Sequence, residues 1–491
     1  MARRTLRSLV LASLGCTLAG CAMGPNFVEP KPAVPAQWSA TATGNGTEGA
    51  AHVSPEPAHT AAWWSTFNDP TLTSLVEQSA GENLNVKEAV LRIEEAQAQV
   101  AVVAGGLWPN LSANASWSRQ RLSTNTPSGA IFGLHFPGLP PTLVNPYNQY
   151  QLGLGASWTL DLFGTERRAL EAANAQMQAA VEGEHAALLS MVSDVAATYI
   201  DLRGAQARRA ILVRSLATQR DLLQLTRDRR NAGLTSDLDV ENATAEVGTT
   251  QAEVPLADRE ITFDINELSQ LMAKPPEALR AELGQAQPVP PVPPNVPIGL
   301  PAELARRRPD IRQAEANLHA ATAEIGIAIS SYFPQLTLTA AGGYQSEGLS
   351  QLIRTASRFA SLGPAIELPI FEGGRLHATV QLRRVQAKEA AVIYAQTVLT
   401  ALNQVEDALA AYGADQARRA SLETAVTASR NARLLARQRY ESGVASFIDV
   451  LDAERTEEEN EVALAEATTA VSADLVQLYR ALGGGWAVPL A

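Results

Sequence analysis

The sequence repeats itself, and this repeat constrains the fold more than any other feature. The stretch RDRRNAGLTSDLDV at 227–240 returns 210 residues later as RQRYESGVASFIDV at 437–450. In each copy a helical pattern ends at a glycine, and a second pattern begins three residues later at a serine that is followed by a capping aspartate. The glycine and serine are Gly233 and Ser236 in the first copy and Gly443 and Ser446 in the second. Each copy therefore predicts a helical hairpin.

Matches outside the hairpins indicate that the duplication covers most of the chain. NVKEA at 85–89 corresponds to DIRQA at 310–314, and WPNLSANASW at 108–117 corresponds to FPQLTLTAAGGY at 333–344. A proline-rich stretch between the halves excludes both helix and central strand. We therefore expect a first repeat at 61–284, a linker at 285–299, a second repeat at 300–483 and a short tail at 484–491.

The amino terminus carries a secretion signal. Three arginines among the first seven residues precede an apolar run at 9–19 that is too short to span a bilayer. The tetrapeptide LAGC at 18–21 resembles the bacterial lipobox, in which the cysteine becomes the acylated first residue of the mature chain. We expect a signal peptide at 1–20 and a lipid on Cys21; a plain signal peptide with a chance cysteine is the alternative. Ala22 follows the cysteine where lipoproteins held at the inner membrane often carry Asp, so the resemblance to the lipobox implies sorting to the outer membrane.

The composition argues against several classes of protein. A formal net charge of −12 disfavours a nucleic-acid partner. Only 5% of the residues are aromatic, which suits closely packed long helices better than a bulky globular core. Cys16 is lost with the leader, so Cys21 alone remains and an intramolecular disulfide is excluded. Residues 21–60 are rich in proline and polar residues and predict an extended tail without a core, with order beginning near Trp63.

Each repeat contains two segments in which apolar and polar residues alternate. Alternation with period two is typical of amphipathic strands, and it is clearest around Leu152 and Leu154. Pro364 and Pro369 weaken the pattern in the last segment. We expect strand pairs at 108–122 with 150–162 and at 332–345 with 359–370.

A very long helix follows each strand pair, at about 165–230 and about 374–441, and a return helix follows each hairpin tip. Apolar residues recur along both long helices at heptad spacing, which predicts packing like that of a coiled coil. The repeating residues are Leu188, Val192, Val195, Tyr199 and Leu202, and in register Val398, Leu402, Val405, Leu409 and Tyr412. Gly204 and Gly413 are expected to mark local breaks. The hairpin tips are expected at 231–236 and 441–446.

The four strands limit how the chain could enter a membrane. Outside the leader, no apolar run is long enough for a transmembrane helix. Amphipathic strands can enter a bilayer as a closed β-barrel, but the smallest such barrels need about eight strands. One chain cannot close a barrel, so a membrane location requires an oligomer.

Several motifs resemble those of the TolC-like outer-membrane efflux family. They are the lipobox, WWSTFNDPTLTSLVEQSAGENLNVKEA from 63, RRRPDIRQAEANL from 306, FEGGRL from 371 and RYESGVASFIDVLDAE from 439. The resemblance covers essentially the whole mature chain, and the lipobox points to the NodT-like and OprM-like lipoprotein branch. It implies a mixed α and β fold in which three chains build a trimeric duct. That duct would comprise a twelve-stranded outer-membrane β-barrel and a periplasmic α-barrel of long coiled helices.

The same resemblance implies a function and a location. The homotrimer would be the outer-membrane exit duct of a tripartite efflux system in a Gram-negative bacterium, extending into the periplasm. It would passively conduct small toxic compounds or drugs from an inner-membrane pump of the RND type through a periplasmic adaptor protein. No cofactor is expected beyond the lipid on Cys21.

Three aspartates follow the hairpin tips. Asp239 and Asp449 each lie three residues after a cap serine, and Asp452 lies one turn further on, where the first copy has Asn242. In a trimer these carboxylates would form rings at the periplasmic entrance and favour cations. A capping role at a solvated helix start explains Asp239 and Asp449 equally well, but it does not explain Asp452.

Tyr440 is a further candidate for the gate. It replaces Arg230 of the first copy, and Phe447 replaces Asp237. Positions at which the copies differ cannot be explained by helix ends alone, so the gate is expected among them.

The tips themselves are candidates for docking the adaptor, an expectation that rests on the resemblance. They comprise Gly233 with Leu234 and Gly443 with Val444, and the apolar residue of each pair is expected to be exposed. Some relatives carry a basic residue that locks the closed state where this chain has Ala445. The sequence therefore does not identify the residues that keep the duct closed.

Two other functions stay open at this point. A duct for type I protein secretion has the same fold, whereas a periplasmic coiled-coil scaffold lipoprotein belongs to another class and has no use for four amphipathic strands. The sequence contains no HExxH, GxSxG, P-loop or paired-cysteine pattern, so neither an enzyme nor a metal site is expected.

Overall fold

The computed structural model describes residues 22–31, 34–39, 52–54, 56, 61–123, 125–126 and 146–486. The leader, Cys21 and most of the loop at 123–149 lie outside these residues. The expectations of a signal peptide and of lipidation therefore fall outside the described part of the chain. The chain divides into two units, one of which contains the described residues of 1–29, 95–177 and 317–391, and the second the remainder.

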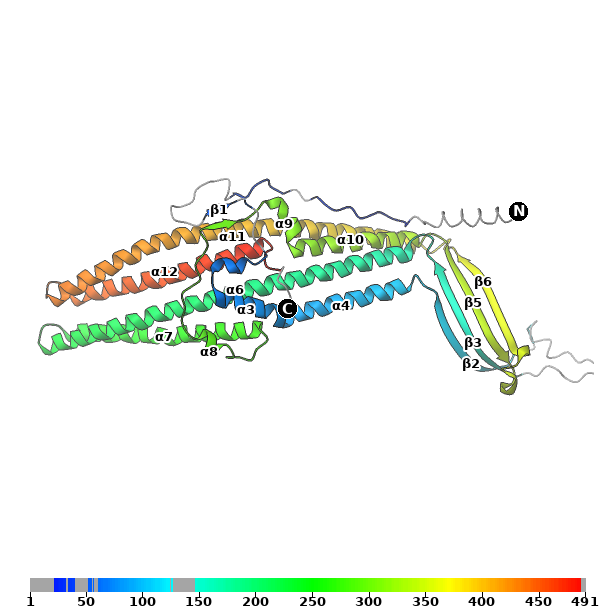
Figure 1. Ribbon diagram of the computed structural model, residues 1–491, viewed down its shortest axis with the longest axis horizontal. Helices are drawn as coiled ribbons and strands as arrows, with labels where there is room; N and C mark the ends of the chain where they lie inside the picture. The colour runs from blue at the N-terminus through cyan, green and yellow to red at the C-terminus, as the bar shows by residue number, and fades with distance from the viewer. Residues whose placement is uncertain are drawn as a thin grey trace, which may run out of the picture. The chain divides into compact units, whose positions relative to one another are not determined.

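The first unit is built around a four-stranded antiparallel sheet (Figure 1). Its strands are β2 (Asn110–Gln120), β3 (Tyr147–Leu160), β5 (Gln335–Ser346) and β6 (Arg358–Glu367). The strands lie in that order, so the pairing of β3 with β5 joins the strand pair of one repeat to that of the other. The sheet is thus a product of the duplication.

The register of the sheet collects the apolar residues on one face. Leu152 lies opposite Ala115 on one side and Tyr344 on the other, and Ala340 lies opposite Leu362. Because directly opposite residues of an antiparallel pair share a face, the alternating pattern of each strand combines into one apolar surface. Its members include Leu111, Trp117, Tyr150, Leu152, Leu154, Leu336, Leu338, Leu362 and Ile366. Several of these side chains are exposed in the single chain, with Leu154 at 55%.

Proline weakens the last strand less than the sequence suggests. Pro364 lies within β6 opposite Leu338, and the strand ends at Glu367, before Pro369. Within the single chain β6 is an edge strand, where a missing backbone N–H is tolerated.

Long helices make up most of the remaining chain, and their lengths reproduce the duplication. The helices α6 (Thr165–Asn231) and α11 (Arg375–Glu441) each contain 67 residues, and the return helices α7 (Asp237–Leu271) and α12 (Phe447–Ala481) each contain 35. The shorter helices are η1 (Trp63–Phe67), α3 (Pro70–Glu82), α4 (Leu84–Gly105), α8 (Arg280–Leu283), α9 (Pro301–Arg307), α10 (Pro309–Ser330), η3 (Leu349–Gln351) and η4 (Thr355–Ser357). Within the described ranges, no helix combines the length and the apolar character needed to cross a membrane.

The expected helix breaks at Gly204 and Gly413 are absent, because α6 and α11 run through them without interruption. Gly204 has a packing reason instead. A Cβ atom at Gly204 would lie 2.5 Å from Thr469 Oγ1, whereas one at Gly413 would meet no atom within 4 Å. Gly204 therefore permits a close approach between α6 and α12.

The core of the second unit confirms the heptad prediction. All ten heptad residues of α6 and α11 are buried, from Leu188 to Leu202 and from Val398 to Tyr412. Trp63 lies among them, where its ring stacks on Tyr479 at 5.2 Å and its Nε1 donates to the Gly484 carbonyl. The two copies thus share one apolar core.

The expectation of a tail without a core is wrong in two places. Trp38 is buried in the core of the second unit, and its indole Nε1 donates to the carbonyl of Gly299 at 3.1 Å. Strand β1 (His52–Ser54) pairs in parallel with β4 (Asn295–Pro297), which belongs to the proline-rich linker. The proline-rich, polar composition of residues 21–60 predicts an extended backbone. An extended segment can still place an aromatic side chain in the core and pair with another strand.

Residues 22–27 are also docked, in the first unit. Arg168 of α6 is 3% exposed and holds this segment through its guanidinium group. Its Nε lies 3.1 Å from the Met23 carbonyl, and its Nη2 lies 2.8 Å from Asn26 Oδ1. The opposite edge of the guanidinium pairs with Glu171 at 2.7 Å.

Close packing adds to this docking. Gly24 has φ +93°, and a Cβ there would lie 2.5 Å from the Cα of Gly326 in α10. Phe27 stacks on His319 with the ring centres 4.4 Å apart, and His319 bonds to Glu171. The segment next to the predicted lipid anchor therefore contacts α6 of the first repeat and α10 of the second.

Candidate functional site

Both hairpin tips have the same backbone geometry. At the first tip, Leu234 N–H donates to the Arg229 carbonyl and Gly233 N–H to the Arg230 carbonyl, which is a Schellman motif. Gly443 and Val444 repeat these hydrogen bonds in the second copy. The glycines have φ of +73° and +76°, and a Cβ atom on either would meet no atom within 4 Å, so backbone conformation rather than crowding requires glycine there.

The apolar tip residues are exposed as the sequence predicts. Leu234 is 66% exposed and Val444 is 69% exposed. Their contact with an adaptor remains a prediction.

Two of the three candidate gate aspartates are engaged within their own hairpins. Asp239 accepts from the backbone N–H of Ser236 at 3.2 Å, and Asp449 accepts from that of Ser446 at 2.9 Å, with the serine hydroxyls completing both capping boxes. The hydrogen bonds from Ser446 hold the pKa of Asp449 below its ordinary value. Helix capping therefore accounts for both positions in the single chain, and a gate role for them stays a prediction.

Asp452 is placed differently. Its side chain is exposed on α12, one turn beyond the capping box, and its charge helps to raise the pKa of Arg455, whose main partner is Glu246 of α7. No cap explains this carboxylate, so Asp452 remains the gate candidate that the sequence favours.

Two positions at which the copies differ contact each other within each hairpin. They are 230 and 237 in the first hairpin and 440 and 447 in the second. In the first hairpin Arg230 Nε lies 2.6 Å from Asp237 Oδ1 in an exposed ion pair. In the second, Tyr440 and Phe447 occupy the same two positions and pack edge to face, with ring centres 6.0 Å apart. An ion pair in one copy thus corresponds to an aromatic pair in the other.

The aromatic pair is buried. Tyr440 is 3% exposed, and the guanidinium of Arg229 from the first hairpin lies 4.5 Å from the centre of its ring. Its hydroxyl has no hydrogen-bond partner among the described residues. Tyr440 therefore holds the two hairpins together within the chain; its role as a gate residue remains a prediction.

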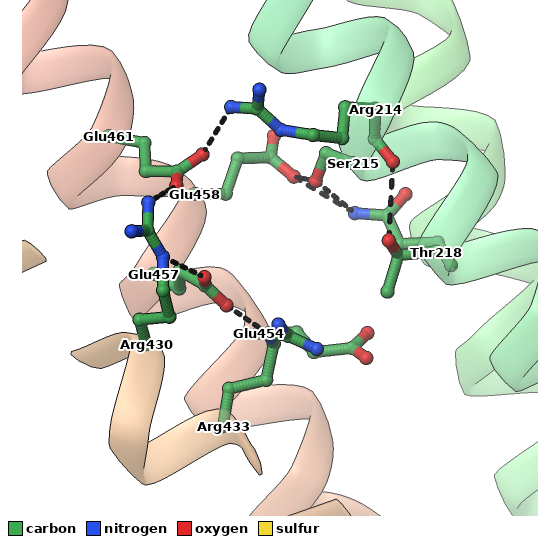
Figure 2. Close-up of a pocket in the computed structure, with 10 residues that line it drawn as sticks. Arg214, Ser215, Thr218, Arg430, Arg433, Glu454, Glu457, Glu458 and Glu461 are labelled. Carbon is green, nitrogen blue, oxygen red and sulfur yellow. Dashed lines mark hydrogen bonds and ion pairs between the residues drawn. The ribbon is translucent and has the colours of Figure 1, made fainter. Parts of the chain in front are cut away.

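A polar cavity of about 290 Å³ lies among α6, α11 and α12 (Figure 2). Ten charged or polar side chains from these three helices line it. They are Arg214, Ser215, Thr218 and Gln219 of α6, Arg430 and Arg433 of α11, and Glu454, Glu457, Glu458 and Glu461 of α12.

Three of the four glutamates have partners in this cavity. Glu461 bridges Arg214 of α6 at 2.8 Å and Arg430 of α11 at 2.6 Å. Glu457 pairs with Arg433 and lies 3.5 Å from Arg430. These ion pairs connect α12 to both long helices.

Among the described residues, neither Glu458 nor Glu454 forms an ion pair with an arginine. Glu458 accepts from the Ser215 hydroxyl and, at 3.0 Å, from the Gln219 amide. Glu454 is 5% exposed, and neither of its carboxyl oxygens has a hydrogen-bond partner among the described residues. Figure 2 draws no dashed line to this carboxyl group.

Sequence reasoning missed this cavity, although a signal was present. Glu454, Glu457, Glu458 and Glu461 follow helical spacing on one face of α12, whereas the equivalent residues of the first copy include no acid. The difference between the copies, which drew attention to Asp452, extends for two further turns.

The two repeats, each with a helical hairpin and a strand pair, match a known protein family. The family of outer membrane efflux proteins matches residues 75–274 and 300–484, which is well over half of the chain. The chain belongs to the outer membrane efflux protein family. Nodulation protein T of Rhizobium leguminosarum bv. viciae is 33% identical to this efflux protein over 482 residues, covering 98% of the chain and 94% of the relative. Outer membrane protein OprJ of Pseudomonas aeruginosa is 33% identical over 476 residues, with coverages of 96% and 95%.

Solved structures agree with this assignment of the efflux protein. The outer-membrane channel OprN superposes with a TM-score of 0.84 at 35% identity, covering 95% of this chain and all of that channel. The open-state MtrE channel of Neisseria gonorrhoeae gives a TM-score of 0.78 at 30% identity, covering 96% and 100%. The mixed α and β fold is therefore that of a TolC-like channel, as the sequence motifs predict.

Membership also fixes the location and the general activity of this efflux protein. It is an outer-membrane efflux channel of a Gram-negative bacterium that extends into the periplasm. Its fold class is that of a duct rather than of an enzyme.

Proposed function

We propose that this chain forms a homotrimeric exit duct of a tripartite efflux system. The duct passively conducts small toxic organic compounds or drugs from an inner-membrane pump of the RND type, by way of a periplasmic adaptor, to the exterior. A lipid on Cys21 adds a second attachment to the outer membrane.

One observation carries the proposal, namely the uncovered apolar face of the four-stranded sheet. Its register places leucines and aromatic residues side by side across all four strands, and Leu154 and Leu362 are exposed. An exposed apolar surface of this extent requires lipid or a partner to cover it. Four strands are too few to close, and three copies would supply the twelve strands of a barrel whose outer face meets lipid.

The hairpins support an adaptor as partner. Each ends in a rigid Schellman turn that exposes one apolar side chain, Leu234 or Val444. With two exposed apolar tip residues per chain, a trimer would present six, which suits a ring of adaptor subunits.

Names of relatives support the class of cargo. They include a solvent efflux pump outer membrane protein and a toluene efflux pump outer membrane protein of Pseudomonas putida, each 32% identical to this chain. The alternatives have less support, because these two relatives are named for efflux and a scaffold lipoprotein does not need the apolar sheet face.

Reconstitution tests the proposal. The full-length lipoprotein purified in detergent should run as a trimer and form ion-conducting pores in planar bilayers. A deletion strain should become more susceptible to toluene and to antibiotics, and the wild-type gene should restore tolerance. A monomeric, soluble helical rod after Cys21→Ser, with no pore activity, would instead favour the scaffold.

A further inference from the structure

Glu454 stands out among the acidic residues of the second hairpin. It is 5% exposed, it lines the cavity among three helices, and both of its carboxyl oxygens lack a hydrogen-bond partner among the described residues. An ionised carboxylate in this setting would lose its hydration without gaining a hydrogen bond in exchange. The geometry therefore suits the neutral acid.

The charges of the cavity lead to the same conclusion. Four glutamates face three arginines, and the arginines are taken by Glu457 and Glu461. Glu458 is held by neutral donors from Ser215 and Gln219. Glu454 and Glu458 thus have no arginine partner among the described residues, and of the two only Glu454 also lacks a hydrogen-bond donor.

Charged residues of α7, α11 and α12 act on the Glu454 carboxyl group. From α11, Arg433 and Arg437 favour its ionised form; from α12, Glu457 opposes it, as does Glu246 from α7. Of the α6 residues that line the cavity, Ser215, Thr218 and Gln219 are neutral, and Arg214 pairs with Glu461. Burial is the largest effect and, together with the two glutamates, raises the pKa of Glu454 to about 7.

A metal ion does not fit the cavity. Within the described residues, no group of three or more His, Cys, Asp or Glu side chains is arranged to hold one. The neighbouring carboxylates are already occupied by arginine, serine and glutamine, so a proton is the positive charge that the site can accept.

We propose that Glu454 is a proton-binding site in the wall of the second hairpin, and that the proton bound there keeps α12 packed against α6 and α11. On deprotonation the carboxylate draws water toward itself from the cavity that it lines, and this hydration weakens the packing of α12 against the long helices. The site thus couples periplasmic pH to the packing of the hairpin that carries Asp452. This coupling rests on the proposed function, in which that hairpin borders the entrance of the duct.

The two hairpins differ in this respect. The first copy has Thr244 at the position of Glu454, and a threonine does not titrate. The pH response that Glu454 produces is therefore confined to the second hairpin.

The direction of the response follows from proton linkage. The packed state holds Glu454 with a pKa of about 7, whereas a hydrated glutamate has its ordinary value of 4.5. The stabilisation of the packed state is complete below the ordinary value and is lost as pH rises through about 7. Between those two values the ratio of loosened to packed hairpins should rise by about tenfold per pH unit, and above about pH 7 it should level off because Glu454 is then ionised in both states.

Spin labels at the two tips can measure this ratio. Leu234→Cys and Val444→Cys place one label on each hairpin, and pulsed electron resonance of trimers in lipid reports the distances between labels. Asp264 and Asp474 have pKa values raised to about 7 and about 6 by burial and by neighbouring carboxylates, so the experiment is run in an Asp264→Asn, Asp474→Asn background.

The proposal predicts that a first distance population dominates below about pH 4.5 and that a second, longer one reaches its full extent above about pH 7. Glu454→Gln should keep the first population at every pH, because glutamine stays neutral. Glu459→Gln is the matched control, since it removes the same charge from an exposed position of α12 and should leave the transition in place.

Two results would overturn the proposal: no second population in the background protein, or the same transition in Glu454→Gln. If Glu454→Gln does not assemble, Glu454→Asp must shift the midpoint, and an unmoved midpoint is equally fatal. Pore formation at one fixed pH tests the duct separately, so a pore without a pH response removes the proton site alone.

Discussion

At the scale of the residue, some side chains at the hairpin tips are explained by helix capping and others are not. Ser236 with Asp239 and Ser446 with Asp449 form the same capping box, so their matching is explained by two helix starts. Asp452 has no such local role. Its carboxylate is the one to test first at the entrance.

Replacing Asp452 by alanine should increase the leak conductance of reconstituted trimers or reduce their preference for cations. The reason is that a ring of three exposed carboxylates attracts cations and is lost in the variant. Single-channel recordings with a salt gradient provide the measurement. Asn242→Ala alters the equivalent position of the first hairpin without changing charge and should behave like the wild type. Identical recordings from Asp452→Ala and wild type would remove Asp452 from the gate.

Arg168 is the residue that holds the segment behind the predicted anchor. Arg168→Ala leaves Glu171 without its arginine and the Met23 carbonyl without its donor, at a cost of about 3 kcal/mol. Amide hydrogen exchange at residues 22–29 should become faster by a factor of about 100. Arg92→Ala, at an exposed pair with Glu88, should leave that exchange unchanged. Unaltered protection in Arg168→Ala would mean that other contacts hold the segment.

At the scale of the element, the long helices depend on packing more than on local propensity. Gly204 and Gly413 both lower the intrinsic stability of a helix, yet neither interrupts one. Burial of the heptad residues stabilises these helices and offsets the low helix propensity of the two glycines. The two glycines differ only in what surrounds them.

That difference predicts opposite effects of alanine. Gly413→Ala should stabilise the protein by about 1 kcal/mol, because a helical glycine with open space around it gains only propensity. Gly204→Ala should destabilise it by about 1–3 kcal/mol through overpacking. The new Cβ would lie 2.5 Å from Oγ1 and 2.7 Å from Cγ2 of Thr469, so rotating that side chain does not relieve both contacts. Thermal or denaturant unfolding in detergent measures both changes, and a stabilising Gly204→Ala would contradict the close approach of α6 and α12.

At the scale of the whole molecule, the sheet divides its residues between two environments. Leu154 belongs to the apolar face and Ser157, three residues along the same strand, to the opposite face. In the proposed trimer the first meets lipid and the second meets the interior of the duct.

Arginine at these two positions should therefore have unequal effects. Leu154→Arg places a charge in lipid, which costs about 2–4 kcal/mol per chain near the middle of a bilayer, and it should reduce the amount of heat-resistant trimer in the outer-membrane fraction. Ser157→Arg should assemble normally and alter conductance instead. If both variants assembled equally well, the apolar face would not be the lipid-facing one.

Much of this architecture could be predicted because it is written in local patterns. Period-two alternation placed the four strands to within a few residues, and heptad spacing identified side chains such as Val192 and Val405 that are completely buried. The capping pattern located both tips. These features depend on neighbouring residues along the chain, so the sequence displays them directly.

The tail and the acidic cavity could not be predicted in the same way. Trp38 looked like part of a coreless tail, because nothing nearby in sequence reveals that Gly299 accepts its indole N–H. Nothing in the sequence around Glu454 distinguishes its carboxyl group from those of Glu457, Glu458 and Glu459. Its burial depends on α6 and α11, whose facing residues lie more than 20 positions away in the chain.

The sequence by itself determined the duplication, the two hairpins, the strands and the family, since each rests on spacing along the chain. Only the tertiary structure decided which side chains lose water and which partners they meet. It joined the repeats through β3 and β5, packed Tyr440 beneath Arg229, and enclosed Glu454 without a partner. The physical reason is that desolvation depends on everything that surrounds a group in space, and for these residues the surroundings come from distant parts of the chain.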